Sequence, residues 1–412
     1  MLVALDRKKL YRFPWSMTDN PGGWVEVTDT CDLSCPGCYR QRLDGHRPLE
    51  DVLADIAACK KITNCDCMKI SGGEPLIYPH IIEVIEFISR NGMKPLILTN
   101  GVSLDRPFAR TMEKAGLKKI NFHIDSSQNR PGWEGKKEHE LNELRQHYAD
   151  LVWELKDVSC GFNATVSRSN LADIPDIVEW TLRNIHKVRH LSLIALRGIC
   201  ISDDVAFFAN GKRLEPNAIP NRFENPDEIS ITSEEILDVI QRRFPEIHPC
   251  AYIGGTTFPE TNKYLVSINI GTRRHIFGAL GARTVELIQV LNHLAKGRYM
   301  TSSNRSQVGR KIFLLSFFDP EVKKLFTQFL KLTFKYPAKF FDRVYAQPIA
   351  LEQPFELIKG EINLCDGCIN MMIYRGRLIP SCRMDEYRLY NSPITPQKIT
   401  RENQARSLRG QT

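Results

Sequence analysis

The sequence predicts an α/β protein with a parallel sheet in its first half, and three observations support this. Six short apolar segments typical of strands occur between residues 22 and 200, at 24–28, 68–71, 95–99, 120–124, 162–166 and 190–194. Segments of helical periodicity separate them. Turn-forming or polar residues follow most of the strand segments. Strands that alternate with helices favour a parallel sheet with right-handed crossovers.

The intervening helices are expected at 49–60, 80–89, 109–114, 134–156 and 174–185. The second of them has apolar residues that share one helical face, namely Ile81, Ile82, Val84, Ile85 and Ile88. Gly92 is well placed to end this helix. Ligands of parallel α/β folds gather at the carboxyl ends of the strands, so we expect functional residues directly after the strand segments.

The pattern changes after residue 200. Residues 201–229 look like loops, and Thr232–Glu235 forms a capping-box motif before a helix at 236–243. A strand and turn are expected at 262–275. Residues 284–345 look mostly helical, with breaks at Gly297, Gly309 and Pro320. We therefore divide the chain into a core at 1–200, an α-rich basic segment at 201–350, a cysteine-rich module at 351–392 and a flexible tail at 393–412.

The composition narrows the class of protein. The chain has 412 residues, 25% of them charged and 42% hydrophobic, which excludes a disordered or collagen-like chain. Its first twenty residues hold no apolar run, and no stretch of 18 apolar residues occurs, so we expect neither a secretory signal nor a spanning helix. Twelve cysteines in a chain expected to be cytoplasmic indicate metal sites or free core thiols.

Three of these cysteines directly follow the first strand segment. Cys31, Cys35 and Cys38 stand within eight residues, close enough to surround one metal centre. Thiolates suit iron–sulfur clusters and zinc. Three ligands would leave one iron of a cubane cluster open, as a catalytic cluster needs, whereas a structural zinc site would want four ligands. A zinc knuckle is the alternative reading.

The later strand ends carry a resemblance. The Cys-x3-Cys-x2-Cys spacing, together with Gly72-Gly73-Glu74-Pro75 after the second strand, resembles the radical S-adenosylmethionine (radical SAM) superfamily over roughly residues 22–200. The resemblance implies a partial (βα)6 TIM-like barrel and a catalytic 4Fe-4S cluster on the three cysteines. It also implies that SAM is cleaved reductively to a 5′-deoxyadenosyl radical, which abstracts a substrate hydrogen.

The same resemblance implies a set of SAM contacts. The loop backbone at Gly72 and Gly73, with Glu74 and Pro75, would hold the methionine amino group. Asn100 and Asp125 end the third and fourth strands with family-like polar residues, the latter facing ribose or substrate. Ser167 and Arg168 would meet the SAM carboxylate, and Leu196 would flank adenine. The usual aromatic residue before the third cysteine is Gly37 here, and Tyr39 follows that cysteine instead, a departure that affects the adenine contact.

A second cysteine group lies near the end of the chain. Cys365 and Cys368 precede a predicted hairpin at 372–382 with Gly376 in its turn, and Cys382 leaves it. This resembles the twitch or SPASM modules that hold an auxiliary 4Fe-4S cluster, although five residues rather than four separate Gly376 from Cys382. Zinc is the alternative metal. The fourth ligand would be Cys250, or an open position that binds substrate.

The remaining cysteines have no metal-ligand spacing, so we predict buried thiols at Cys59, Cys65, Cys67, Cys160 and Cys200. Four further residues cluster at or after the fourth strand, either at the cavity mouth or on a surface loop: His123, Gln128, Arg130 and Trp133. At the mouth, Trp133 with Arg130 could clamp a planar or acidic group.

The positive charge is concentrated in one segment. Residues 268–344 hold fourteen Lys or Arg against four acids, and nine phenylalanines, so the rest of a chain of net charge +8 sums to −2. A basic, aromatic and helical segment suits an anionic membrane surface or a phosphate-bearing substrate. A packed helical subdomain with a solvated basic face is the structural alternative. No nucleic-acid-binding motif accompanies the charge, which argues against nucleic acid.

These observations lead to one functional expectation and two alternatives. We expect a radical SAM enzyme with an auxiliary cluster, served by a reductant such as flavodoxin or ferredoxin, that acts on a small, anionic or lipid-like substrate, with a membrane surface as a further contact. One alternative is a peptide-modifying (RiPP maturation) radical SAM enzyme, although only thirty residues precede Cys31, too few for an added peptide-recognition domain. The other is a zinc-binding scaffold or nucleic-acid-binding protein.

Overall fold

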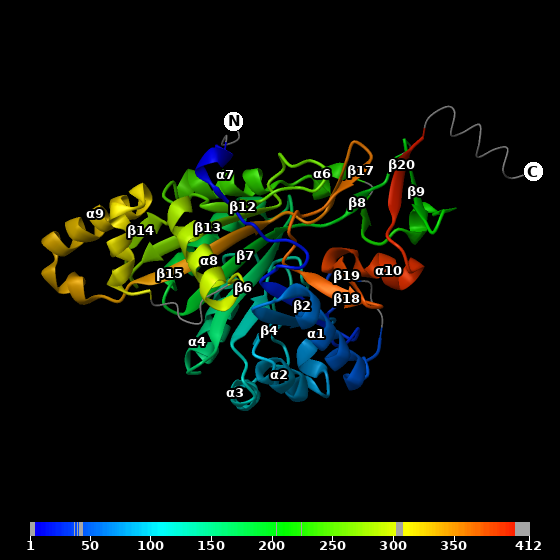
Figure 1. Ribbon diagram of the computed structural model, residues 1–412, viewed down its shortest axis with the longest axis horizontal. Helices are drawn as coiled ribbons and strands as arrows, with labels where there is room; N and C mark the ends of the chain where they lie inside the picture. Colours follow the sequence, from blue (N-terminus) through cyan, green and yellow to red (C-terminus); the bar gives the residue numbers. More distant parts are fainter. Residues whose placement is uncertain are drawn as a thin grey trace, which may run out of the picture.

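Six parallel strands in chain order form the centre of the fold (Figure 1). The computed structural model describes residues 5–36, 38, 40, 44–202, 204–223, 225–301 and 308–399. The six strands are β2 (Gly22–Glu26), β3 (Cys67–Ser71), β4 (Lys94–Thr99), β5 (Lys119–His123), β6 (Ser159–Val166) and β7 (Val188–Ala195). All six predicted strands are therefore confirmed. The large parallel sheet agrees with the predicted α/β class and is consistent with a partial barrel.

Five helices alternate with these strands: α1 (Leu49–Thr63), α2 (Ile81–Arg90), α3 (Arg106–Lys114), α4 (Asn142–Trp153) and α5 (Ile174–Arg183). The predicted apolar face of α2 is confirmed, since Ile81, Val84, Ile85 and Ile88 are buried. Helix α4 begins eight residues later than predicted. Residues 134–141 stay irregular there because Glu138 bonds to neighbouring loops instead of facing solvent from a helix.

The sheet continues beyond both ends of the six strands. Next to β7 lie β15 (Tyr345–Glu352), β13 (Tyr264–Gly271), β12 (Ala251–Ile253) and β1 (Tyr11–Arg12), and β14 (Ile276–Ala279) pairs with β13. The expectation of an α-rich segment at 201–350 is wrong in this respect, because its strands extend the main sheet. Periodicity indicated the strand at 262–275 but not its long-range partners.

The predicted hairpin forms and joins the opposite end of the same sheet. Strands β18 (Met371–Tyr374) and β19 (Arg377–Pro380) enclose Gly376, whose φ is +77°, and β18 pairs with β2. The second cysteine group is therefore attached directly to the strand that precedes the first one.

Three other helices begin or end at capping or breaking residues that the sequence predicted. Helix α7 (Ser233–Arg243) carries the capping box between Thr232 and Glu235. Helix α8 (Ala282–Lys296) ends at the left-handed Gly297, and α9 (Pro320–Lys335) begins at Pro320. The shorter elements are α6 (Pro226–Ile229), α10 (Met384–Tyr390), β8 (Ile199–Cys200), β9 (Val205–Ala209), β10 (Lys212–Arg213), β11 (Arg222–Phe223), β16 (Glu356–Ile358), β17 (Glu361–Asn363) and β20 (Thr395–Lys398).

Two further predictions concern the C-terminal segment and membrane-spanning helices. Strand β20 pairs with β9, so the expectation of a loose tail from residue 393 is wrong for 395–398, and residues 400–412 lie outside the described part. Among the described helices, none combines the length and hydropathy that a membrane crossing requires.

Candidate active site

The first cysteine group lies on the loop that leaves β2. Cys31 and Cys38 are exposed and Cys35 is half-buried. Burial raises the pKa of the Cys35 thiol to about 12, the nearby charges of Cys38 and Asp125 add to the rise, and Arg130 lowers it. A thiol with such a pKa keeps its proton at neutral pH until a cation replaces the proton, which is how thiolates become metal ligands.

Two glycines bring the Ser71–Pro75 loop against the chain that leads to Cys31. The backbone N–H of Gly73 donates to Thr28 O (2.7 Å), and that of Glu74 donates to Thr30 O (2.9 Å). A Cβ atom at Gly73 would lie 2.1 Å from Thr30 O, and one at Gly72 would lie 2.3 Å from Thr28 O. Only glycine permits this approach, so the motif fixes the base of the cysteine loop.

The Glu74 carboxylate joins the ends of β3 and β4. It is 1% exposed and accepts hydrogen bonds from Thr99 Oγ1 (2.6 Å), Asn100 N (2.7 Å) and Leu76 N (3.0 Å). Burial raises its pKa to about 7 against the effect of these donors. The sequence analysis assigned Glu74 to the SAM ammonium, but here three protein donors already occupy the carboxylate. The adjacent Pro75 is buried at the start of a 3-10 turn.

Asn100 ties the end of β4 to the cysteine loop. Its Nδ2 donates to Asp32 Oδ1 (2.6 Å) and lies 3.9 Å from Cys31 Sγ. Its carbonyl accepts from Arg130 Nη2 (2.7 Å). Asn100 therefore contacts the loop that carries the cysteines, as its place at a strand end predicted.

Asp125 is buried at the end of β5 and is held by donors from two strands. His123 Nε2 lies 2.9 Å from Asp125 Oδ2, Ser127 N donates to Oδ1 (3.0 Å), and Thr165 N donates to Oδ2 (2.9 Å). Burial opposes the charge of Asp125, but these hydrogen bonds outweigh it and hold the pKa well below its usual range. Asp125 thus places a fixed negative charge close to Cys35.

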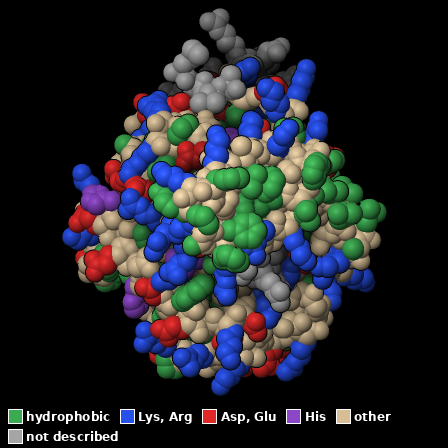
Figure 2. Space-filling view, turned by 90° about the vertical axis from the view of Figure 1, so that its left-hand side faces the viewer, with side chains coloured by type: hydrophobic (Ala, Val, Ile, Leu, Met, Phe, Trp, Pro, Cys, Tyr) green, Lys and Arg blue, Asp and Glu red, His purple; other side chains and the backbone are tan. Residues whose placement is uncertain are grey.

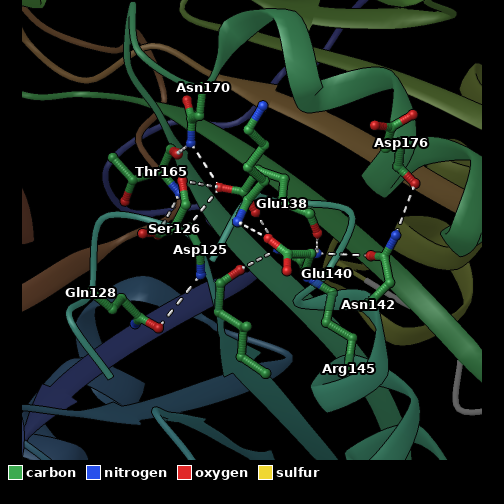
Figure 3. Close-up of polar contacts among 12 residues, drawn as sticks. Asp125, Ser126, Gln128, Glu138, Glu140, Asn142, Arg145, Thr165, Asn170 and Asp176 are labelled. Carbon is green, nitrogen blue, oxygen red and sulfur yellow. Dashed lines mark hydrogen bonds and ion pairs between the residues drawn. The ribbon is translucent and has the colours of Figure 1, made fainter. Parts of the chain in front are cut away.

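A buried ion pair that the sequence analysis missed supports this region (Figure 3). Glu138 and Arg145 are both 0% exposed and bond to each other. Glu138 Oε1 also accepts from Ser126 N (2.8 Å) and from Asn170 Nδ2 (2.9 Å). The pair therefore joins the loop after β5 to the loop after β6. No motif or spacing marks Glu138 and Arg145 in the sequence.

The loop after β6 only partly matches the expectation. Ser167 lies at the strand end, and its Oγ is 2.7 Å from Ser169 Oγ. Arg168 turns toward α7 instead, where it donates to Glu235 Oε1 (2.8 Å) and to Ser230 O. In this conformation Glu235 neutralises the guanidinium, so the expected contact of Arg168 with the SAM carboxylate would require the side chain to turn away from Glu235.

A cavity of about 490 Å³ opens beyond β7. Leu196 lines it together with Gln353 and Phe355 at the end of β15 and with residues of β8 and β9. The predicted adenine contact Leu196 thus borders a space large enough for part of a ligand. Tyr39, the other predicted adenine contact, and Gly37 lie outside the described residues.

Two of the four residues at or after β5 singled out in the sequence are buried, while much of the loop from 129 to 137 is exposed. Gln128 and Arg130 are 5% exposed, and Gln128 Nε2 donates to His123 O (2.9 Å). Arg130 bonds to Asn100 O, and half-buried Trp133 packs against the apolar core. The proposed clamp of Trp133 with Arg130 is not formed; Arg130 fixes the loop instead.

The second cysteine group is brought together from two loops. Cys365, Cys368 and Cys382 are half-buried, burial raises the pKa of all three thiols, and the charge of Cys382 adds to the rise at Cys365 and Cys368. The N–H of Asn370 donates to Cys368 Sγ (3.4 Å). Three thiols within electrostatic range of one another suit a shared metal centre.

Cationic side chains surround this group. Lys263 lies near Cys365, Lys69 near Cys368 and Arg197 near Cys382, each lowering the pKa of its thiol. Gly367 lets the first cysteine turn pack on the N-terminal segment, since a Cβ atom there would lie 2.4 Å from Trp15 O. These positive charges would partly compensate thiolates, against the nearby carboxylates of Glu352 and Glu386.

Cys250 lies in an apolar cluster against which Cys365 packs. Its thiol donates to Val266 O (3.2 Å). Cys250 as the fourth ligand stays a prediction. The predicted buried thiols are confirmed at Cys59, Cys65, Cys67 and Cys160, and Cys200 is half-buried.

Neither cysteine group has its side chains arranged around a common metal position in this structure. Across the described residues, no three or more His, Cys, Asp or Glu side chains lie close enough to hold a metal ion. The donor sets nevertheless fit iron, because both groups supply three thiols and lack the fourth cysteine of a closed zinc site.

Comparison with known proteins defines the class. Residues 25–180 match the radical SAM superfamily. This match and the enzyme relatives support a radical SAM enzyme. The alternative of a zinc-binding scaffold finds no support among these relatives.

The relatives cover part of the chain. The GTP 3′,8-cyclase of Alkaliphilus oremlandii is 36% identical over 109 residues, 25% of this chain and 34% of that protein. The probable GTP 3′,8-cyclase of Methanocaldococcus jannaschii is 27% identical over 164 residues, 38% of this chain and 53% of that protein. The chain thus spans about a third to a half of the length of these relatives.

Two solved structures that resemble this chain are less similar to it in sequence than these relatives are. SuiB of Streptococcus suis bound to its precursor peptide SuiA has a TM-score of 0.35 and 19% identity, with 43% of this chain and 40% of that chain covered. The anSMEcpe structure with bound AdoMet has a TM-score of 0.39 and 12% identity, with 55% and 59% covered.

Proposed function

We propose that the protein binds a 4Fe-4S cluster through Cys31, Cys35 and Cys38, cleaves SAM reductively and abstracts hydrogen from a substrate. The observation that carries the proposal is the docking of the Gly72–Gly73 backbone onto Thr28 and Thr30, directly before Cys31. When bound, the cluster supplies the electron that splits SAM into methionine and the 5′-deoxyadenosyl radical. The chain itself holds the cysteine loop and orients SAM.

The proposed SAM contacts lie at the carboxyl ends of successive strands. They are the backbone from Gly72 to Pro75 after β3, Asn100 after β4, Asp125 after β5, Ser167 after β6 and Leu196 after β7. Parallel strands bring these ends to one edge of the sheet, which supports a shared ligand. Arg168 is left out because Glu235 holds it.

We further propose an auxiliary 4Fe-4S cluster on Cys365, Cys368 and Cys382. Its support is that the thiols act electrostatically on one another and that Lys69, Lys263 and Arg197 each lower the pKa of one of them. The fourth position would be open, or filled by a substrate. A reductant such as flavodoxin or ferredoxin is the proposed electron source.

The cleavage of SAM tests the function directly. Protein reconstituted anaerobically with iron and sulfide and reduced with dithionite should convert SAM to 5′-deoxyadenosine and methionine, both measured by chromatography. Iron and sulfide analysis of anaerobically purified protein is the companion measurement. Bound zinc without iron, together with no 5′-deoxyadenosine, would contradict the proposal.

We propose a small anionic or lipid-like substrate, with a peptide as the alternative. The uneven positive charge favours the anion. The alternative has its own motivation, since a structural neighbour is described as bound to a precursor peptide.

A basic aromatic surface at one end of the molecule favours contact with an anionic lipid surface (Figure 2). Phe277, Phe313 and Phe329 are buried in one apolar cluster of this segment, as the packed-subdomain alternative expects. Other apolar side chains of the basic segment face solvent, and five described ones are at least 70% exposed: Leu294, Leu314, Phe317, Phe334 and Phe341. Exposed aromatics surrounded by Lys and Arg are typical of peripheral membrane surfaces.

Liposome binding checks this contact. A Phe334→Ser/Phe341→Ser variant should lose most sedimentation with phosphatidylglycerol vesicles, because its inserted apolar area is gone. Wild-type protein should bind these vesicles less tightly as salt rises and should ignore phosphatidylcholine vesicles. Phe329→Leu, a change in the buried cluster, is the control for altered folding. Equal sedimentation of wild type and the double variant would remove the proposal.

A further inference from the structure

Several strands of the sheet carry polar residues on the inner face and apolar residues on the outer face, which the helices cover. Along β5, Ile120 and Phe122 point into the core beneath the helices, so the alternate residues Lys119 and Asn121 point to the inner face. The same alternation puts Gly161 on this face, and a Cβ atom there would lie 2.0 Å from Asn121 Oδ1 and 3.0 Å from Lys119 Cε. A glycine at 161 therefore leaves room beside both polar side chains.

The strand register gathers positive charge on this face. Lys69 of β3 pairs with Leu96 of β4, and Leu96 pairs with Lys119 of β5, so the two lysines occupy one cross-strand layer. His190 of β7 pairs with Gly161 in the adjoining layer. The positive charges of Arg189 and Lys69 lower the pKa of Lys119, and all three charges lower the pKa of His190. The four side chains therefore lie near one another.

Within the described residues Lys119 has no carboxylate partner, although the thiols of Cys67 and Cys160 lie near it and raise its pKa. It is 7% exposed, and in that part of the chain its Nζ makes no hydrogen bond or ion pair. Burial first, and then the positive charge of Arg189, lowers its pKa to about 7. A buried ammonium without a partner is costly, and proteins normally pair such charges.

The neighbours of Lys119 are already engaged. Lys69 donates to Asn370 Oδ1 and Ile369 O, and Arg189 donates to Ala346 O. His190 Nε2 lies 2.7 Å from Ser192 Oγ, which donates to Glu352 Oε1 (2.8 Å). Among the described residues, therefore, no carboxylate is left to pair with Lys119, and a ligand oxyanion would supply this counter-charge.

We propose that the inner face binds an oxyanion, the carboxylate or phosphate group of a small substrate, through Lys119, with Lys69 and Arg189 adding positive potential. That the oxyanion belongs to the substrate rests on the proposed function; the site itself does not. A charged hydrogen bond from Lys119 would fix one end of the substrate on the inner face of the barrel sheet.

Calorimetric titration of the intact protein with inorganic phosphate, and separately with acetate, tests the site. Wild type should bind at least one of the two, and the arm that binds identifies phosphate or carboxylate. Lys119→Met should weaken that binding by at least about tenfold, because a hydrogen bond to a charged group is lost. Lys114→Met, on an exposed position of α3, should bind like wild type.

Two further readouts keep the result unambiguous. Lys119→Met should unfold at no lower a temperature than wild type, since it removes a buried unpaired charge, so a loss of binding would not reflect misfolding. Equal binding by Lys119→Met and wild type, or no binding of either anion by wild type, would overturn the site. Neither measurement needs SAM cleavage, so failure of the radical chemistry and failure of the anion site are distinguishable.

Discussion

A Cys35→Ala variant, reconstituted and reduced like wild type, should form no 5′-deoxyadenosine from SAM. Cys35 is the half-buried member of the first group, and the charges of Asp125 and Arg130 act on it, so its loss would remove one of three proposed cluster ligands. Three thiolates are the minimum for a site-differentiated cluster, and two would not hold it. Chromatography of the SAM reaction and iron analysis are the measurements.

The matched control is Cys368→Ala in the second group. It should lose roughly half of the iron, as Cys35→Ala should, because each change removes one of two proposed clusters. Unlike Cys35→Ala, it should still cleave SAM without substrate. The assignment of the groups would be reversed if Cys368→Ala abolished cleavage and Cys35→Ala left it intact. Unchanged iron in both variants would contradict cluster binding.

The sequence revealed those parts of the fold that depend on local pattern. The six strands from β2 to β7 appear as short apolar segments, and the capping box at Thr232 and the turn at Gly376 are chemical signals of a few residues. The pairing of β15 with β7 and of β18 with β2 left no such signal. Strands joined by more than a hundred residues pair through the whole fold, and periodicity does not carry that information.

The same distinction applies to the candidate site. The cysteine spacing and the Gly72–Gly73 pair are local, and the structure shows why the glycines are needed. The directions of Glu74 and Arg168 depend on partners elsewhere. Glu74 bonds to the next strand end, and Arg168 reaches Glu235, 67 residues away. A motif identifies which residue stands at a strand end, but the partner decides where its side chain points.

Arg145→Met should destabilise the protein by about 3–5 kcal/mol, because it leaves the Glu138 carboxylate buried without its cation. Both side chains are 0% exposed, and Arg145 also donates to the carbonyls of Glu138 (2.7 Å) and Ile124 (2.9 Å). Urea unfolding followed by circular dichroism measures the change. The loops at Ser126 and Asn170 share Glu138, so SAM affinity should fall as well.

An exposed ion pair provides the contrast. Arg106 and Glu154 are 68% and 39% exposed, so Arg106→Met should cost only about 0–1 kcal/mol. A Glu138→Gln/Arg145→Met double variant should be more stable than Arg145→Met alone, since no unpaired charge remains and the oxygen of the introduced amide can still accept from the two loops. An Arg145→Met variant as stable as Arg106→Met would show that water or another cation reaches Glu138. The pair would then not be the support that joins the ends of β5 and β6.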